Sequence, residues 1–345
     1  MIIKSLHISR LFNEYNYDLD LCDSLTFVHS PNGYGKSTLV RILYSALKGD
    51  IGYLQKTPFS RFDVCFGDGG CLIVEKDSGK LRLMMRRADL TNEISAEEMA
   101  GVRNVCYIPP ERLMIVRDGE LVPTLATFAE ELYERIAYAK EHSELADIPR
   151  EGRPEYTDAD LESKAMDLKA KLDYIREAGF EPELPSGLRF PMSRYELSAR
   201  RQDYEDLILS VSDYVDRNYQ LAESIIIFKD IVNEIFINKS RSITETGRLT
   251  INMDNGSSLE LRSLSSGERQ ILIMFYTLLF HAEPGSVVIL DEPEISLHVS
   301  WQQRLGDFFM DICRVRGLQM IVATHSPTVI HDKWDMAREL KSNDA

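Results

Sequence analysis

The first third of the chain alternates apolar and polar residues as β-strands do, with one helical stretch among them. Strand patterns cover residues 1–9, 19–29, 61–66, 71–76, 80–86 and 102–109, and apolar positions at helical spacing cover residues 36–48. Gly-Asp-Gly-Gly at 67–70 and Asp-Ser-Gly at 77–79 are typical hairpin turns. The pattern predicts a small antiparallel sheet beside a core of strand and helix.

Residues 125–237 have a helical pattern with two apolar stripes. The first stripe opens at Thr157, a candidate helix cap, and closes at Gly179. Spacings of four and three recur in both stripes, which consist of Leu161, Ala165, Leu168, Leu172 and Ile175, and of Leu207, Val211, Tyr214, Asn218, Leu221 and Ile225. Such stripes fit a short antiparallel coiled coil and ordinary helices with one buried face equally well.

The last third returns to strands and then alternates helix and strand. Residues 242–264 have a strand pattern with a turn at Asp254-Asn255-Gly256. They are followed by a helix over 267–281, a strand over 286–291, a helix over 299–316 and a strand over 319–323. Alternation of this kind predicts a parallel sheet with helices on its faces, so the fold class is α/β. We divide the chain into an N-terminal lobe (1–120), a helical insertion (121–240) and a C-terminal lobe (241–345).

Composition narrows the classes of protein. The chain has 345 residues and a net charge of -15, which disfavours non-specific binding of nucleic acid and favours a protein partner. The arginines of the first third fit solvated strand faces better than a DNA track; they are Arg82, Arg86, Arg87, Arg103, Arg112 and Arg117.

The apolar runs, the N-terminus and the cysteines indicate the compartment. The longest apolar run, 271–280, is too short to span a bilayer, and the N-terminus lacks the pattern of a signal peptide, so we expect a cytoplasmic protein. The five cysteines lack a C-x-x-C pair and predict buried thiols, with neither a zinc site nor a disulfide framework. They are Cys22, Cys65, Cys71, Cys106 and Cys313.

One loop has the residue types that hold phosphate. Residues 30–38 read Ser-Pro-Asn-Gly-Tyr-Gly-Lys-Ser-Thr between a strand and a helix, which matches G-x-x-x-x-G-K-[ST] except that Ser30 replaces the first glycine. Backbone N–H groups at the helix N-terminus favour phosphate oxygens, Lys36 can reach the β- and γ-phosphates, and the Ser37 hydroxyl can bind Mg²⁺. The first position needs a tight turn more than glycine itself, so serine is tolerable there.

Three further stretches carry candidate chemistry. Asp291 and Glu292 follow four apolar residues at the carboxyl end of a buried strand, where Asp291 can hold Mg²⁺ and Glu292 can deprotonate an attacking water. Ser265, Ser266 and Gly267 begin an apolar helix and form either a second anion-accepting helix N-terminus or an ordinary serine cap. The strand before His325 ends in Thr-His-Ser-Pro, and that histidine is either structural or a γ-phosphate contact.

The order and spacing of these stretches resemble the head of an ABC-type ATPase. The Walker A, signature, Walker B, D-loop and switch-histidine roles of that family map onto residues 30–38, 264–268, 287–292, 296–298 and 325. The chain resembles the branch with the SMC proteins, RecF and the OLD-like ATPases, and in particular the stand-alone ATPases of anti-phage systems such as the Septu and PARIS types. The resemblance covers about 1–115 and 242–335, and it implies a mixed and parallel sheet, a small antiparallel subdomain and an inserted helical or short coiled-coil region.

The resemblance also implies site residues. ATP would be bound by Asn32, Gly33, Gly35, Lys36, Ser37 and Thr38, with Ser37 and Asp291 on Mg²⁺ and with Glu292 and His325 as catalytic residues. Ser265, Ser266, Gly267 and Glu268 of another copy would close over that ATP, so that ATP would be sandwiched in a homodimer or a larger homo-oligomer.

Two departures from the family pattern are visible. The D-loop reads Ser-Leu-His without the aspartate of transporters, as in OLD-like heads. No glutamine follows the strand where the Q-loop belongs, so Glu111 or Arg112 would take its place.

The biological role has alternatives. The first is a sensor and scaffold whose acidic insertion docks a separate effector, a nuclease in particular, in anti-phage defence. The second is a DNA-repair head like RecF that grips DNA. A transporter ATPase is a third alternative, disfavoured by the missing glutamine, the D-loop and the long insertion.

Overall fold

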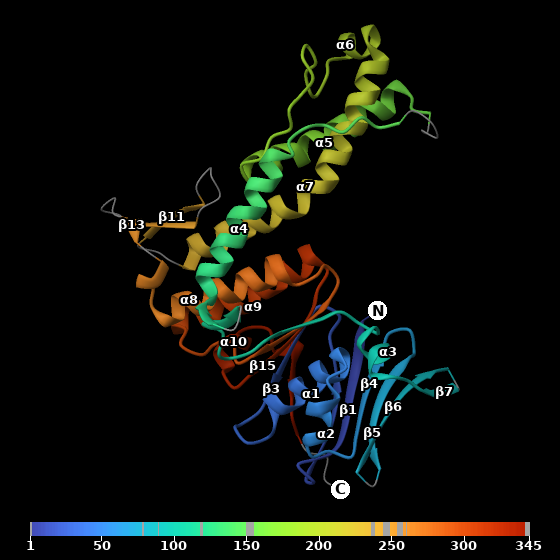
Figure 1. Ribbon diagram of the computed structural model, residues 1–345, viewed down its shortest axis with the longest axis vertical. Helices are drawn as coiled ribbons and strands as arrows, with labels where there is room; N and C mark the ends of the chain where they lie inside the picture. Colours follow the sequence, from blue (N-terminus) through green and yellow to red (C-terminus); the bar gives the residue numbers. More distant parts are fainter. Residues whose placement is uncertain are drawn as a thin grey trace. The chain divides into compact units, whose positions relative to one another are not determined.

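The computed structural model describes residues 2–77, 79–88, 90–117, 120–149, 155–235, 239–243, 249–253, 258–259 and 261–341. The chain forms two compact units, one from residues 1–124 with 265–345 and one from residues 125–264. Both ends of the chain therefore build the first unit, and the middle builds the second (Figure 1).

A five-stranded parallel sheet is the centre of the first unit. Its strands are β3 (Leu25–His29), β8 (Val105–Ile108), β14 (Val287–Asp291), β15 (Gln319–Thr324) and β16 (Ala337–Glu339). They lie in the order β16-β3-β15-β14-β8, and every pair is parallel. The carboxyl ends of β3, β14 and β15, which come from distant parts of the sequence, thus share one edge of the sheet.

Helices cover both faces of this sheet. Helix α1 (Lys36–Lys48) leaves β3 toward the β8 side, whereas α9 (Val299–Arg316) leads from β14 back to β15. Right-handed crossovers in opposite directions place their helices on opposite faces. Helix α9 packs on β3 and β15, and its Phe308 meets Phe275 of α8 (Ser266–Tyr276) with ring centroids 5.5 Å apart.

A six-stranded antiparallel sheet completes the first unit and is larger than the small sheet we expected. Its order is β2-β1-β4-β5-β6-β7. The strands are β1 (Ile3–Leu11), β2 (Tyr15–Asp20), β4 (Arg61–Phe66), β5 (Cys71–Asp77), β6 (Lys80–Arg87) and β7 (Leu90–Glu93). The predicted single strand over 19–29 was wrong, because the chain crosses between the two sheets after β2 and begins β3 only at Leu25.

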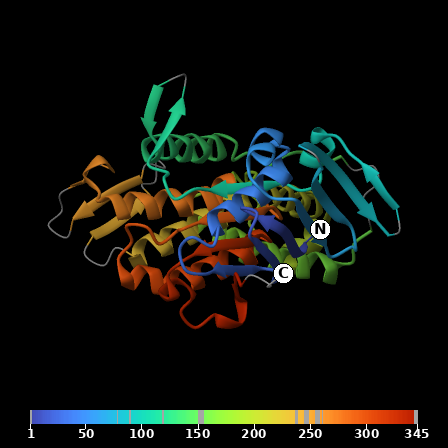
Figure 2. The same cartoon turned by 90° about the horizontal axis from the view of Figure 1, so that it is seen from below.

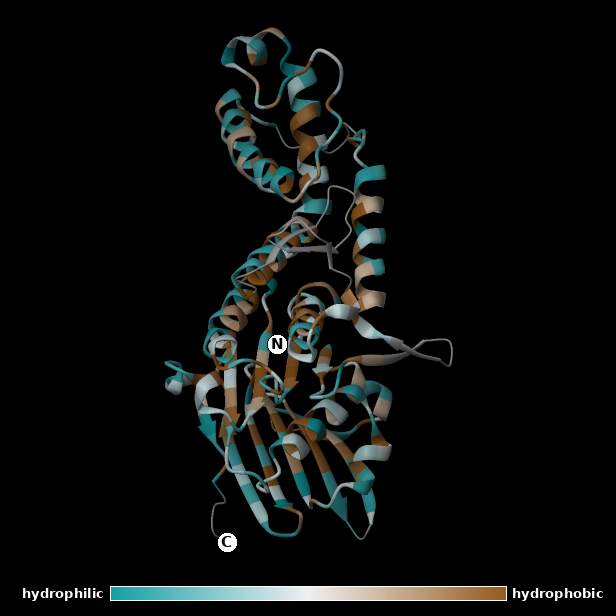
Figure 3. Ribbon diagram, turned by 90° about the vertical axis from the view of Figure 1, so that its left-hand side faces the viewer, coloured by the Kyte–Doolittle hydropathy of each residue, from teal (hydrophilic) through white to brown (hydrophobic). Residues whose placement is uncertain are grey.

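The main core of the first unit lies between the two sheets and α1. Alternate residues of the parallel strands, such as Val287 and Ile289 of β14, join a buried cluster with Leu39 and Leu43 of α1 and with residues of β1 and β4. Period-two alternation in strands and the helical period in α1 therefore meet in one apolar layer. Hydrophobic residues accordingly fill the inner strands in the lower part of Figure 3.

The buried Gln319 connects the two sheets. Its side-chain Oε1 accepts from the Ile3 backbone N–H at 2.8 Å, and its Nε2 donates to the carbonyls of Ile3 at 2.7 Å and Cys22 at 3.0 Å. Buried backbone groups need partners, and this amide supplies them at the point where β1 approaches β15.

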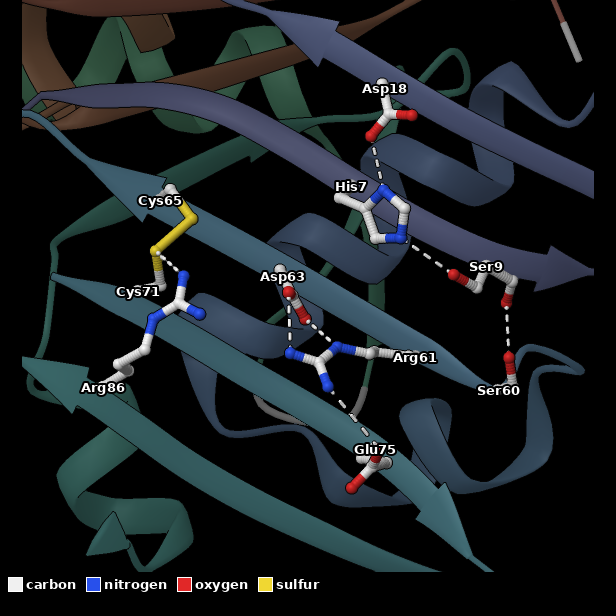
Figure 4. A network of polar contacts seen from close by, with 10 residues as sticks. All are labelled: His7, Ser9, Asp18, Ser60, Arg61, Asp63, Cys65, Cys71, Glu75 and Arg86. Atoms are coloured by element: carbon white, nitrogen blue, oxygen red, sulfur yellow. Dashed lines mark hydrogen bonds and ion pairs between the residues drawn. A yellow bond between two sulfur atoms is a disulfide. The ribbon is translucent and has the colours of Figure 1, made fainter. Parts of the chain in front are cut away.

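Polar pairs and one disulfide link the antiparallel strands (Figure 4). Arg61 donates to both carboxylate oxygens of Asp63 on the same strand, at 2.8 and 3.0 Å, and its Nη1 lies 3.7 Å from Glu75 Oε1 on the neighbouring β5. Cys65 and Cys71 lie directly opposite each other on β4 and β5 and form a disulfide, so the prediction of five thiols was wrong for these two. Hairpin register brings them together, a feature that spacing along the chain does not reveal.

Short elements connect these layers. They are α2 (Ile51–Lys56), α3 (Ala96–Ala100), a π-helix (Thr277–His281), α10 (Pro327–Ile330) and a 3-10 helix (Trp334–Met336). Strands β9 (Met114–Arg117) and β10 (Glu120–Pro123) form a two-stranded ribbon of their own (Figure 2).

The second unit is helical at its centre. It contains α4 (Thr124–Glu141), α5 (Asp158–Glu177), α6 (Arg194–Ala199) and α7 (Arg201–Ile235), followed by β11 (Lys239–Ile243), β12 (Leu249–Met253), β13 (Ser258–Leu259) and a 3-10 helix (Leu261–Ser263). The predicted turn at 254–256 lies outside the described residues. None of the helices in the described ranges combines the length and the apolarity needed to cross a bilayer.

Helices α5 and α7 pack against each other along the two predicted stripes but run parallel, so the antiparallel pairing was wrong. Arg201 at the start of α7 pairs with Asp158 at the start of α5, at 2.9 Å. Further along, Tyr174 of α5 lies against Tyr219 of α7, with ring centroids 5.7 Å apart. The 23 residues between the helices (178–200), including α6, return the chain to the beginning of α5 before α7 starts.

Replacing Leu172 with Ala tests the packing of the α5 stripe. Leu172 is buried in the α5 stripe, so the change should lower the free energy of unfolding by about 2–5 kcal/mol. Met166→Ala on the same helix is the control, since Met166 is 63% exposed and should change it by less than about 0.5 kcal/mol. Chemical denaturation followed by circular dichroism measures both, and equal losses would contradict the packing.

Candidate active site

The glycine-rich loop joins β3 to α1 in the strand–loop–helix arrangement predicted. Gly35 caps α1 with a left-handed φ of 80° and no side-chain hydrogen bond, so no side chain occupies the N–H groups of the first turn. A Cβ on Gly35 would lie 2.9 Å from the ring of Phe12, in the turn between β1 and β2. Glycine is therefore required here both by backbone conformation and by the close approach of that ring.

Lys36 is the buried cation of the loop. It is 5% exposed, and its Nζ donates to the carbonyls of Ser30 at 2.8 Å and Pro31 at 3.1 Å. Burial lowers the pKa of Lys36, while the nearby Glu292, Glu294 and Asp291 raise it. Ser30 contributes its backbone carbonyl to this contact, which explains why a serine can stand in the place of the first glycine.

Asp291 lies at the end of β14 and accepts two hydrogen bonds. Ser37 Oγ donates to Oδ1 at 2.9 Å, and the Tyr107 hydroxyl on β8 donates to Oδ2 at 3.1 Å. Burial raises the pKa of Asp291, the two hydrogen bonds lower it, and the charges of Glu292 and Glu294 raise it again. Tyr107 was not predicted, because its contact with Asp291 depends on β8 pairing with β14.

Glu292 and His325 lie at the same edge of the sheet. The backbone of Glu292 has φ of 47°, a left-handed conformation that is rare outside glycine and that concentrates at functional sites. Its Oε1 is 3.6 Å from Nδ1 of His325, which follows β15. The same Nδ1 is 3.4 Å from Oε1 of Glu294, a residue that the sequence analysis did not select.

The start of α8 is closed on itself by a capping box. Ser265 N and Oγ donate to Glu268 Oε2 at 2.9 and 3.0 Å, and Glu268 N donates back to Ser265 Oγ at 3.3 Å. A Cβ on Gly267 would lie 2.3 Å from the carbonyl oxygen of Ser296, which itself has φ of 64°. Gly267 thus lets the predicted signature turn and the predicted D-loop pack backbone to backbone.

The two candidates for the missing glutamine differ sharply. Glu111 is exposed, whereas Arg112 is buried and donates to the carbonyls of Pro109 at 3.1 Å, Gln270 at 3.3 Å and Pro293 at 3.3 Å. Burial lowers the pKa of Arg112 to about 10, with Glu294 opposing the shift, so the guanidinium stays charged at neutral pH. Arg112 ties the loop after β8 to α8 and to the segment after Glu292.

These residues fit a nucleoside triphosphate with Mg²⁺. An uncapped helix start, one buried cation and a serine–aspartate oxygen pair are the donor set that phosphate and Mg²⁺ use. Asn32, Gly33 and Ser37 are exposed, and Gly35 and Thr38 are half-buried, so the loop is open to a ligand.

Comparison with known families identifies the class of protein. The AAA_21 family, described as "AAA domain, putative AbiEii toxin, Type IV TA system", matches residues 128–331. The chain belongs to this family. The match includes Asp291, Glu292 and His325, and the prediction of an ATPase domain is confirmed.

Individual relatives of this AAA-domain protein share either a short matching segment or a low sequence identity with it. The "Retron Ec83 probable ATPase" of Escherichia coli is 37% identical over 92 residues, which are 22% of this chain and 16% of that protein. An Smc head domain from Pyrococcus furiosus, solved bound to the C-terminal domain of ScpA, is 12% identical with a TM-score of 0.47, covering 95% of this chain and 91% of that one. The SMC head domain of Thermotoga maritima has a TM-score of 0.38 at 12% identity, with coverages of 98% and 92%.

Gly267→Ala tests the packing of α8 on the 296–298 segment. The new methyl group must displace the Ser296 carbonyl, so we expect a loss of about 1–3 kcal/mol in unfolding free energy. Ser266→Ala in the same turn is the control because Ser266 is exposed. Differential scanning fluorimetry reports both, and a Gly267→Ala variant as stable as the control would contradict the contact.

Asp291→Asn should stabilise the protein in the absence of Mg²⁺. The ionised Asp291 is buried beside two other carboxylates, so its removal should add about 1 kcal/mol and raise Tm by about 2–4 °C in chelator. Because the folded-state pKa is raised, folding favours the protonated form, and the gap between variant and wild type should narrow as pH falls toward that pKa. Added Mg²⁺ should raise Tm of the wild type alone; an equal rise in the variant would exclude Asp291 as a ligand.

Proposed function

We propose that this protein is an ATP-hydrolysing switch whose ATP is held between two copies of the chain and whose nucleotide state controls a separate effector. The observation that carries the proposal is the Ser37–Asp291 hydrogen bond of 2.9 Å beside the buried Lys36. The loop with the start of α1 and the end of β14 come from two distant parts of the sequence and converge on one donor set. That convergence supports phosphate binding more strongly than the loop motif alone.

The residues divide the work as follows. Lys36 and the N–H groups of Gly33, Gly35 and Thr38 bind phosphate oxygens, with Asn32 at the mouth of the loop. Ser37 and Asp291 hold Mg²⁺, which when bound neutralises phosphate charge. Glu292 accepts the proton of the attacking water, and His325 beside it contacts the terminal phosphate.

Aromatic residues next to the loop suggest where the base binds. Phe12 and Tyr34 are exposed, and Tyr34 lies against Tyr15 with ring centroids 5.8 Å apart. Phe12 also touches the site of Gly35. An adenine ring stacks favourably on such faces, so the turn between β1 and β2 is the proposed base platform.

The second copy enters through α8. Ser265, Ser266, Gly267 and Glu268 form a helix N-terminus whose internal cap satisfies only part of its N–H groups, and a γ-phosphate of a facing copy would complete it. ATP would then bind the dimer more tightly than the monomer, and hydrolysis would release it. Nucleotide state would set assembly state.

A role in defence is supported by the family description and by the retron relative. The effector would be a separate protein, a nuclease in particular, and the insertion is its proposed dock because residues 127–181 contain fifteen Asp and Glu against eight Lys and Arg. The Septu and PARIS systems are the named types that this arrangement would match. A RecF-like DNA-binding head is the alternative, and DNA affinity that falls steeply with salt would favour it.

Glu292→Gln tests the catalytic assignment against Lys36→Ala. The glutamine keeps the shape of the site but cannot take a proton, so ATP turnover should fall at least 100-fold while ATP binding persists, and light scattering should detect an ATP-stabilised dimer. Lys36→Ala should lose ATP binding and dimerisation together. Normal turnover by Glu292→Gln would exclude it as the base, and ATP retention by Lys36→Ala would exclude the loop.

A further inference from the structure

Glu294 is a buried carboxylate that the proposed chemistry leaves without a role. It is 4% exposed and lies three residues beyond Asp291. Its Oε1 accepts from Thr324 Oγ1 at 2.5 Å and from the His325 backbone N–H at 3.1 Å, and it lies 3.4 Å from His325 Nδ1. One oxygen therefore meets both the backbone and the ring of His325.

Burying this charge needs a reason. Its other oxygen, Oε2, is buried without a hydrogen-bond partner in the described part of the chain, and an ionised group in that state costs stability. The neighbouring charge of the buried Arg112 offsets part of the cost. If Glu294 served only to hold the turn, a neutral side chain would do so at a smaller cost in folding stability.

The turn around His325 has other supports. Ser326 N donates to Thr324 Oγ1 at 3.0 Å, and Ser326 Oγ donates to Gln302 Oε1 of α9 at 2.9 Å. These bonds fix the backbone but not the ring. Glu292, at 3.6 Å, is the second carboxylate near Nδ1, and it is needed free for the attacking water.

We propose that Glu294 is the positioning residue of His325. Its carboxylate holds the proton on Nδ1 and fixes the plane of the imidazole, so that Nε2 points away from the carboxylates with the nitrogen available to the substrate. This inference rests on the proposed function, because it assigns Glu294 to the same ATP site. Glu294 acts through His325 and does not itself touch the reacting atoms.

The matched variant is Glu294→Gln. Its amide oxygen can still accept from Thr324 Oγ1 and the His325 N–H, so the turn is kept while the charge beside the ring is lost. We expect kcat for ATP to fall about 10- to 100-fold with KM within about twofold of wild type. Asp63→Asn is the control for loss of a largely buried carboxylate elsewhere, and it should leave kcat unchanged.

A double-variant cycle separates positioning from a general structural role. In a His325→Ala background, Glu294→Gln should have no further effect on kcat, because the residue acts only through the ring. An undiminished effect of Glu294→Gln in that background, or a rise in KM with a matching loss of Tm, would overturn the proposal. If Glu294→Gln folds poorly, Glu294→Asp is the second variant. It keeps the charge but moves it away from the ring, and its kcat should fall less than that of Glu294→Gln.

Nitrogen NMR of histidine-labelled protein supplies a readout that does not need activity. The chain has seven histidines, and His325→Ala identifies the signal of His325. Wild type should show Nδ1 protonated, and Glu294→Gln should shift the ring toward a mixture of tautomers; identical spectra would overturn the inference. A wild-type chain without ATP hydrolysis would instead count against the proposed function, and the spectra would still decide the role of Glu294.

Discussion

The placement of charge at the edge of an apolar sheet is the constraint on which the first unit depends. Strands β14 and β15 are buried along their whole length, yet β14 ends in Asp291, and Glu292 and His325 directly follow the two strands. The buried Lys36 lies close to these carboxylates, and the buried Arg112 lies close to Glu294. The two sheets, α1 and α9 can be understood as the frame that keeps these opposite charges close together.

Buried charges at this edge of the sheet lower the stability of the fold but supply groups that can bind a ligand. Burial raises the pKa of Asp291 and lowers the pKa of Lys36, so the ionised form of each group is less stable than it would be in water. The left-handed backbone of Glu292 and of Ser296 adds local strain in the same segment. A ligand that brings both phosphate charge and a cation relieves these costs, which is the physical reason to expect tight coupling between nucleotide binding and the shape of this segment.

Local pattern was enough to predict elements whose cause is local. Helix α1, strand β4 and helix α9 have the predicted bounds, because helical spacing and alternation are properties of a short stretch. Lys36, Ser37 and Asp291 could also be selected from sequence, since their motifs are contiguous, and the structure brings them together. Their catalytic and binding roles remain predictions.

Features that depend on distant pairing could not be found that way. Tyr107 meets Asp291 only because β8 pairs with β14, and Phe12 meets Gly35 only because a hairpin turn folds over the loop. The disulfide follows from register, and the parallel course of α5 and α7 follows from a long return connection. Glu294 offered one signal, a second glutamate two residues after Glu292, but its purpose is visible only beside His325.

One loop of the first unit, after β8, contacts the residues that flank the insertion in the sequence. At its entry, Thr124 N donates to the Leu113 carbonyl at 3.1 Å; after its exit, the Gln270 carbonyl of α8 accepts from Arg112 at 3.3 Å. Two adjacent residues of one loop thus contact the parts of the first unit that precede and follow residues 125–264. Within the first unit, Arg112 joins the start of α8 to Pro293 beside Glu292, so a displacement of α8 would reach the segment that carries the proposed base.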